Sequence, residues 1–420
     1  MKQGTYARFF QRRFVWILII LSAFILLAGS LRGGITALPP IIDVVQRELG
    51  LSAAQAGLVT SIPVFCFGFF TPLTSIVLRH FALNQAVSLG LAIVIVGAIV
   101  RSLGFSSTLF LGTFLIGLGT TAGNLVITML ISRDFRHRAG IMTAAYSTMI
   151  DVMIAASTAF TFPLVAYIGW QGAAGAWGVA PALFALVACL IVYPLKHPGI
   201  RPFLARKAGW KVRSDDALVT SEAATASEIY RWPIAWLMAL AFAINTFCYF
   251  GVAAWLPRIL AEMLQMNSAD AGFAASIYHV IGVIAPLTMM ALQRLIRGQT
   301  STILGIVSCA WLLMPLGMLL LPSWWVVWSA CGGLGQGAFF SITFTLVIER
   351  TATTAQTRTL SALVQSLGYG LGALGPWAIG RMVDLTANWF CPFIVLTLLT
   401  GSLVVISQVV ARSTSRPHAR

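Results

Sequence analysis

A small set of polar side chains interrupts stretches that are otherwise apolar, and these are the residues with chemistry to offer. Arg32 is a cation, Asp151 a carboxylate, and His279 an imidazole that titrates near neutral pH. The others are amides and a phenol that suit a small polar solute: Asn124, Asn245, Gln336, Gln365 and Tyr146. Such groups are costly inside apolar helices unless they face a polar interior. The set therefore predicts a central, water-accessible binding cavity.

Each of these residues also has a structural interpretation. Arg32 either contacts an anionic solute, snorkels to the outer interface, or pairs with helix carbonyls beside Gly33 and Gly34. Asp151 is a candidate proton carrier, a partner for Arg32 or an inter-helix hydrogen bonder. His279 is a candidate for proton coupling or a packing residue, and amides also hold helices together in membranes. The sequence leaves these alternatives open.

The stretches that carry these residues are too apolar for a soluble protein. Of the 420 residues, 58% are hydrophobic and only 9% are Asp, Glu, Lys or Arg. An ordinary soluble chain has about 25% charged residues. A chain of this composition could not cover its surface with polar groups, so the composition excludes a compact soluble enzyme. It indicates a membrane protein with many spans.

A helix crosses the hydrocarbon layer in about 20 apolar residues. The sequence predicts twelve spans, at 14–39, 53–78, 83–104, 107–132, 139–165, 171–194, 232–258, 270–294, 300–321, 324–348, 356–381 and 388–411. Spans three, six, nine and twelve are almost wholly apolar, which predicts that they face lipid.

The basic residues predict the orientation of these spans. The termini and the even-numbered connections carry 22 of the 27 Lys and Arg residues, whereas the odd-numbered connections carry Arg47, Arg101, Arg258 and Arg381. Basic connections stay in the cytoplasm. We therefore predict cytoplasmic termini and a bacterial-type inner membrane location. The net charge of +15 reflects this orientation and does not indicate nucleic acid binding.

The two halves of the chain repeat each other. The sequence Gly-Leu-Gly at 117–119 recurs at 333–335, and Pro-Leu-Thr at 72–74 recurs at 286–288. Ordered matches at a nearly constant offset indicate a parallel duplication. We predict an all-α membrane protein with six-helix bundles at 1–194 and 232–411, a cytoplasmic linker at 195–231 and a cytoplasmic tail at 412–420.

Two charged pairs occupy matching positions at the predicted cytoplasmic ends of spans four and ten. They are Arg133-Asp134 and Glu349-Arg350. They are either solvated helix ends or, as we favour, ion pairs that latch the closed cytoplasmic side. The chain has no P-loop, His-Glu-x-x-His or Gly-x-Ser-x-Gly motif. We therefore expect no enzyme activity, cofactor or metal, and transport driven by solute or ion gradients.

Several motifs resemble those of one transporter family. They are Leu31-Arg32 followed by Ile-Thr-Ala-Leu-Pro-Pro at 35–40, Gly123-Asn124, Gly-Leu-Gly-Gln-Gly at 333–337 and Gln-Ser-Leu-Gly-Tyr at 365–369. Together they resemble the cyanate and 2-nitroimidazole transporter branch of the major facilitator superfamily along nearly the whole chain. The chain departs from that pattern at Ser30, where the family usually has Asn or a similar polar residue, and at Asp151, where it usually lacks a carboxylate. Both departures lie near the expected cavity and bear on the substrate.

The resemblance implies a major facilitator fold of two pseudo-symmetric bundles. We predict a secondary active transporter of a small polar or anionic, cyanate-like solute that works by alternating access. One alternative is efflux of nitroimidazole-like or other drug-like compounds, with Arg32 structural. Another is a membrane sensor or receptor on a transporter scaffold. The expected partners are a small-molecule solute and the lipid bilayer, without nucleic acid, and we expect a monomer.

Overall fold

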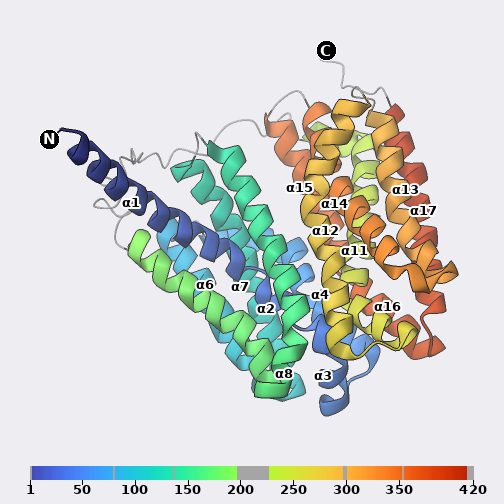
Figure 1. The fold of residues 1–420 in the computed structure, drawn as a ribbon. Coiled ribbons are helices and arrows are strands. Elements are labelled where there is room, and N and C mark those ends of the chain that lie inside the picture. Colours follow the sequence, from blue (N-terminus) through green and yellow to red (C-terminus); the bar gives the residue numbers. More distant parts are fainter. Residues whose placement is uncertain are drawn as a thin grey trace. The chain divides into compact units, whose positions relative to one another are not determined.

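The computed structural model describes residues 2–78, 81–135, 138–195, 227–296, 300–351 and 354–413 (Figure 1). Within these ranges the chain is helical and contains no strand, which confirms the predicted all-α fold. Most of the predicted linker and tail, namely residues 196–226 and 414–420, lie outside the described residues.

The elements follow one another along the chain as α-helices with a few short 3-10 or π turns (η). They are α1 (Lys2–Ser30), α2 (Gly33–Thr36), η1 (Pro39–Ile41), α3 (Ile42–Leu49), α4 (Ala53–Phe65), η2 (Cys66–Phe70), α5 (Thr71–Leu78), α6 (Leu83–Arg101), α7 (Ser106–Asp134), α8 (Ala139–Val192), η4 (Ser227–Arg231), α11 (Pro233–Leu264), α12 (Ser268–Leu295), α13 (Thr300–Leu320), η5 (Pro322–Trp324), α14 (Trp325–Glu349), α15 (Thr354–Gly372), α16 (Leu374–Thr386) and α17 (Phe390–Arg412).

Among the described residues, ten helical stretches are long and apolar enough to cross a membrane. The predicted spans 139–165 and 171–194 share one of these stretches, Ile141–Val192. They join at Gly169, whose φ of 67° and ψ of 172° turn the chain inside α8. The span predicted at 356–381 is divided at Ala373 between α15 and α16.

One compact unit contains the described residues of Met1–Ala37, Phe70–Ile154 and Gln171–Val219. In this unit α6 and α7 lie side by side (Figure 1). Their backbones touch because a glycine is present: a Cβ on Gly112 would lie 2.5 Å from the carbonyl oxygen of Gly97. Apolar side chains such as Phe24, Leu27 and Val126 fill the core of the unit. Close approach at small residues is how membrane helices gain van der Waals contact.

The other unit contains the described residues of Leu38–Phe69, Ala155–Trp170 and Thr220–Arg420. Buried aromatic side chains, among them Phe242, Trp255 and Trp311, lie in its core. Helix α4 packs backbone to backbone on α16, where a Cβ on Gly57 would lie 2.3 Å from the Pro376 carbonyl oxygen. Residues 38–69 and 155–170, which belong to the predicted first bundle, therefore pack within this unit.

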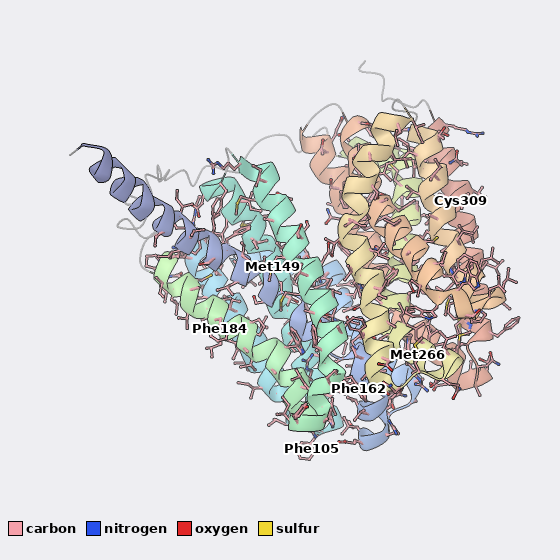
Figure 2. All side chains as sticks on the ribbon, in the orientation of Figure 1. Phe105, Met149, Phe162, Phe184, Met266 and Cys309 are labelled. Atoms are coloured by element: carbon pink, nitrogen blue, oxygen red, sulfur yellow. The ribbon has the colours of Figure 1, made fainter. Side chains whose placement is uncertain are left out.

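Helices that the sequence predicts to face lipid expose large apolar side chains. Phe184 on α8 has an exposed fraction of 65% (Figure 2), and Leu398 on α17 has one of 67%. Such surfaces suit a hydrocarbon solvent, because lipid tails are as apolar as these side chains.

Candidate solute-binding site

Arg32 lies at a break between α1 and α2 and is half-buried. Its backbone, with φ of −124° and ψ of −35°, departs from the helical conformation. The Arg32 carbonyl accepts bonds from the amides of Ile35 (2.9 Å) and Thr36 (3.1 Å), and from the Thr36 hydroxyl (3.0 Å). Irregular backbone at membrane depth is tolerated where protein or a water-filled cavity surrounds it.

The break is fixed by close contacts on both sides of Arg32. A Cβ on Gly33 would lie 3.0 Å from the carbonyl oxygen of Trp177 on α8. Leu31 packs on α7, where a Cβ on Gly123 would lie 2.3 Å from a Leu31 methyl carbon. The residue after Gly123 is Asn124, so the break and this predicted site residue belong to one packed region.

Asn124 on α7 and Tyr146 on α8 are joined directly. The Tyr146 hydroxyl donates to the Asn124 side-chain oxygen at 2.7 Å, and both residues are half-buried. This bond uses the oxygen of the Asn124 amide and leaves its NH2 group as a donor. The arrangement presents hydrogen-bond donors, which suits a solute with negative charge or acceptor atoms.

Asp151 lies on α8 and interacts electrostatically with Arg32. The residues two positions before and after it, Met149 (Figure 2) and Met153, pack against α1: a Cβ on Gly29 would lie 3.0 Å from Met149 and 3.2 Å from Met153. The electrostatic interaction with Arg32 keeps the partner role among the alternatives that the sequence left open for Asp151. Arg32, Asp151, Asn124 and Tyr146 all belong to the unit that contains α1.

The remaining predicted site residues belong to the unit that contains α11. Asn245 on α11 is 1% exposed, and its side-chain oxygen has no hydrogen-bond partner among the described residues. Gln336 on α14 packs on α12, where a Cβ on Gly282 would lie 3.2 Å from the Gln336 side-chain nitrogen. Gln365 on α15 is half-buried. The next residue after Asn245, Thr246, donates to the Gly368 carbonyl at 2.7 Å and so ties α11 to α15.

His279 on α12 is buried among aromatic rings. Its ring centroid lies 5.1 Å from that of Tyr278 and 6.5 Å from that of Tyr249. The Tyr278 ring stacks on that of Trp311 on α13, with 6.3 Å between their centroids. The Tyr278 hydroxyl and the Trp311 indole nitrogen have no hydrogen-bond partner in the described part of the chain. Tyr278 and Trp311 are fully buried, so the cluster is a packed aromatic core that contains unused polar atoms.

Three of the four predicted gate residues make hydrogen bonds within their own units. Arg133 pairs with Asp134 at 2.8 Å and donates to Asn84 on α6 at 3.1 Å. Arg350 donates to the Val410 carbonyl on α17 at 2.6 Å, and Glu349 is exposed. Partial burial lowers the pKa of Arg350, and the Glu349 carboxylate opposes this shift.

Sequence reasoning missed polar contacts at the predicted outer ends of the helices. Arg258 on α11 bonds Glu262 at 2.6 Å and Gln46 of α3 at 2.6 Å, and pairs with Asp43 of α3 at 3.1 Å. Asp384 on α16 accepts from the first two amides of α4, at 2.9 and 2.8 Å. Carboxylates are stabilising at helix N-termini. The only signal in the sequence was the presence of charges beside predicted outer connections.

A further correction concerns Arg101, which the orientation argument placed in an outer connection. It is the last residue of α6 and is 0% exposed. Its guanidinium donates to the carbonyls of Gly34 and Ala174, so it lies inside the unit that contains α1. The sequence could not reveal this, since backbone carbonyl acceptors have no residue signature.

The chain is similar to several known proteins. A model of the Major Facilitator Superfamily matches residues 18–376. The 2-nitroimidazole transporter of Escherichia coli (strain K12) is 28% identical over 396 residues, which are 94% of this chain and 96% of that protein. The cyanate transport protein CynX of the same strain is 23% identical over 401 residues, covering 92% of this chain and 96% of that one. The crystal structure of a D-xylose-proton symporter has a TM-score of 0.72 at 13% identity, covers 95% of this chain and 98% of its own, and shares the fold.

Proposed function

Because this chain belongs to the Major Facilitator Superfamily, we propose that it is a secondary active transporter that carries a small polar or anionic, cyanate-like solute by alternating access. The observation that carries this proposal is Arg32, a half-buried cation at a helix break, in the same unit as the bonded Asn124 and Tyr146. The two Escherichia coli relatives are named for 2-nitroimidazole and cyanate. Cyanate and a nitro group both offer electron-rich acceptor atoms, to which a guanidinium donates strong hydrogen bonds.

The proposed solute site consists of the polar residues that the sequence singled out. Arg32 supplies the positive charge, and Asn124 and Tyr146 supply hydrogen bonds. Asn245, Gln336 and Gln365 supply amides. The side-chain oxygen of Asn245, which has no partner in the described part of the chain, supports a role in binding, because a buried polar atom without a partner is costly unless a ligand or water completes it.

We assign proton coupling to Asp151, with His279 as the second candidate. Asp151 and an anionic solute compete for the charge of Arg32, since Asp151 already interacts with it. Protonation of Asp151 removes this competition and frees Arg32 for the solute. An anion and a proton would then bind together and cross together.

Alternating access requires contacts that break on each side in turn. The proposed bundles, 1–194 and 232–411, rock about the solute site, and residues 195–231 connect them. On the cytoplasmic side the proposed gate consists of Arg133, Asp134, Glu349 and Arg350. On the outer side the contacts of Arg258 and Asp384 join segments of the first bundle to helices of the second. We place the protein in the inner membrane as a monomer with cytoplasmic termini.

A second candidate function is efflux of nitroimidazole-like compounds. The half-buried ring of Tyr249, beside Tyr278 and His279, favours it, because a planar heteroaromatic solute stacks on such a ring. Under this alternative Arg32 is structural, and its charge is satisfied by Asp151.

Uptake into proteoliposomes tests the proposal and separates it from the alternative. Wild type and Arg32→Gln would be compared with labelled cyanate and with a neutral nitroimidazole, with and without a pH gradient. Saturable cyanate uptake that the substitution abolishes supports the Arg32 site. Transport of the neutral compound alone, unchanged in Arg32→Gln, would favour the efflux function.

A further inference from the structure

Arg101 is a buried cation whose partners are backbone carbonyls. It is 0% exposed, its Nη1 donates to the Gly34 carbonyl, and its Nη2 donates to the Ala174 carbonyl at 2.8 Å. Its Nε has no hydrogen-bond partner among the described residues. A buried guanidinium is unfavourable unless its hydrogen bonds are well made, so the two carbonyl bonds explain how the charge is tolerated there.

The Gly34 carbonyl needs a partner because of the helix break. Helix α2 ends at Thr36, whereas the amide in helical register with Gly34 belongs to residue 38. Arg101 supplies the donor that the short helix lacks. The bond therefore fixes the segment that begins directly after Arg32.

The second acceptor lies where this segment meets α8. A Cβ on Gly34 would lie 3.2 Å from the Cα of Gly178, and Ala174 lies one helical turn before Gly178 on the same face of α8. Arg101 thus bonds one carbonyl on each of two backbones at the place where they touch. The planar guanidinium suits this task, because it donates in two fixed directions.

We infer that Arg101 is a positioning residue for the solute site: its two bonds hold the α1–α2 break in the conformation that presents Arg32. The inference rests on the proposed function, in which Arg32 binds the solute. Arg101 itself stays inside the protein and acts through Gly34. A lysine donates from a single nitrogen and lacks the planar two-nitrogen fork that reaches both carbonyls, so Arg101→Lys should behave as a loss of function.

The transport test uses a double-mutant cycle between Arg101→Met and Arg32→Lys, which keeps a cation at residue 32 so that uptake stays measurable, with cyanate uptake in proteoliposomes as the readout. We expect Arg101→Met and Arg101→Lys to raise the cyanate concentration for half-maximal uptake about tenfold. A change of this size lies within the interaction energies found between neighbouring residues. In the Arg32→Lys background, Arg101→Met should cause no further loss. Arg381→Met, which removes an exposed arginine, is the control and should match wild type.

A second perturbation leaves Arg101 in place. Gly34→Ala adds a methyl group 3.2 Å from the Gly178 Cα and should raise the same half-maximal concentration, whereas Gly401→Ala, which has no atom within 4 Å of its added Cβ, should not. If the Arg101 and Gly34 variants lower only the melting temperature and leave uptake unchanged, the inference is wrong. Additive losses in the double mutant would also overturn it.

A readout without solute separates this inference from the proposed function. Arg32→Cys, in a background whose six cysteines are replaced, reports the position of residue 32 through its rate of thiol labelling. We expect Arg101→Met to change this rate at least threefold, whether or not cyanate is the substrate. An unchanged rate would refute the positioning role. If wild type takes up no cyanate but Arg101→Met still changes the labelling rate, only the proposed function is refuted.

Discussion

The contact between Asp384 and the start of α4 makes a quantitative prediction. Each carboxylate oxygen accepts one backbone amide, from Ala53 at 2.9 Å and from Ala54 at 2.8 Å. Asp384→Asn removes the charge and replaces one acceptor oxygen by an NH2 group, so one bond is lost and the other weakened. Hydrogen bonds to charged groups contribute about 1.5–3 kcal/mol, and the exposure of Asp384 reduces this to about 1–2 kcal/mol. That corresponds to a factor of about 5–30 in the population of the state that holds the contact.

Ser61 offers a reporter for that state. It is 3% exposed and lies one helical turn after Gly57, on the face of α4 that packs against α16. Ser61→Cys, in a background without other cysteines, would be labelled with a membrane-impermeant maleimide added outside intact cells. We expect Asp384→Asn to increase the labelling rate by the same factor of about 5–30, since α4 and α16 separate more often.

The matched control is Asp270→Asn on α12, an exposed carboxylate that accepts a bond from the side chain of Asn267, the residue before its helix. It should leave the labelling rate at the wild-type value. An unchanged rate in Asp384→Asn would refute the role of this contact in outer closure. An equal increase in Asp270→Asn would refute its specificity.

Three further predictions concern transport. Tyr146→Phe removes the bond to Asn124 and should raise the cyanate concentration for half-maximal uptake up to about tenfold, as expected for loss of one hydrogen bond, with little effect on the maximal rate; an unchanged value would remove both residues from the site. Gly57→Ala places a methyl group 2.3 Å from a carbonyl oxygen of α16 and should slow uptake severely, whereas Gly401→Ala should not; equal rates would show that this contact is dispensable. Asp151→Asn should take up cyanate without stimulation by a pH gradient, and retained stimulation would point to His279.

Much of the fold was predictable from the sequence because a bilayer imposes simple rules. Apolar length predicted the helices, and the family resemblance is confirmed by the match over residues 18–376. The breaks within helices were less predictable. The span predicted at 14–39 is interrupted at Arg32, and its break depends on contacts with Gly123 and Trp177 that only the folded chain supplies. Gly169, by contrast, lies in the predicted turn between spans five and six and has the positive φ that favours glycine.

The sequence singled out candidate residues by type, but it could not predict which of them contact each other. Polar residues inside apolar stretches drew attention to Asn124 and Tyr146, and their mutual bond arises from the packing of α7 on α8. The burial of Arg101 was not predicted, because a basic residue near the end of a span is normally expected to face water. Its acceptors are main-chain carbonyls, which any residue provides.

The central claim, that the protein carries a small anion by alternating access, is tested most directly by counterflow. Proteoliposomes would be loaded with unlabelled cyanate and diluted into a trace of labelled cyanate, with wild type beside Arg32→Gln. A carrier exchanges solute across the membrane, so we predict transient accumulation of label in wild type and none in Arg32→Gln. Absence of accumulation in wild type, with cyanate bound but not exchanged, would contradict the claim and indicate a sensor.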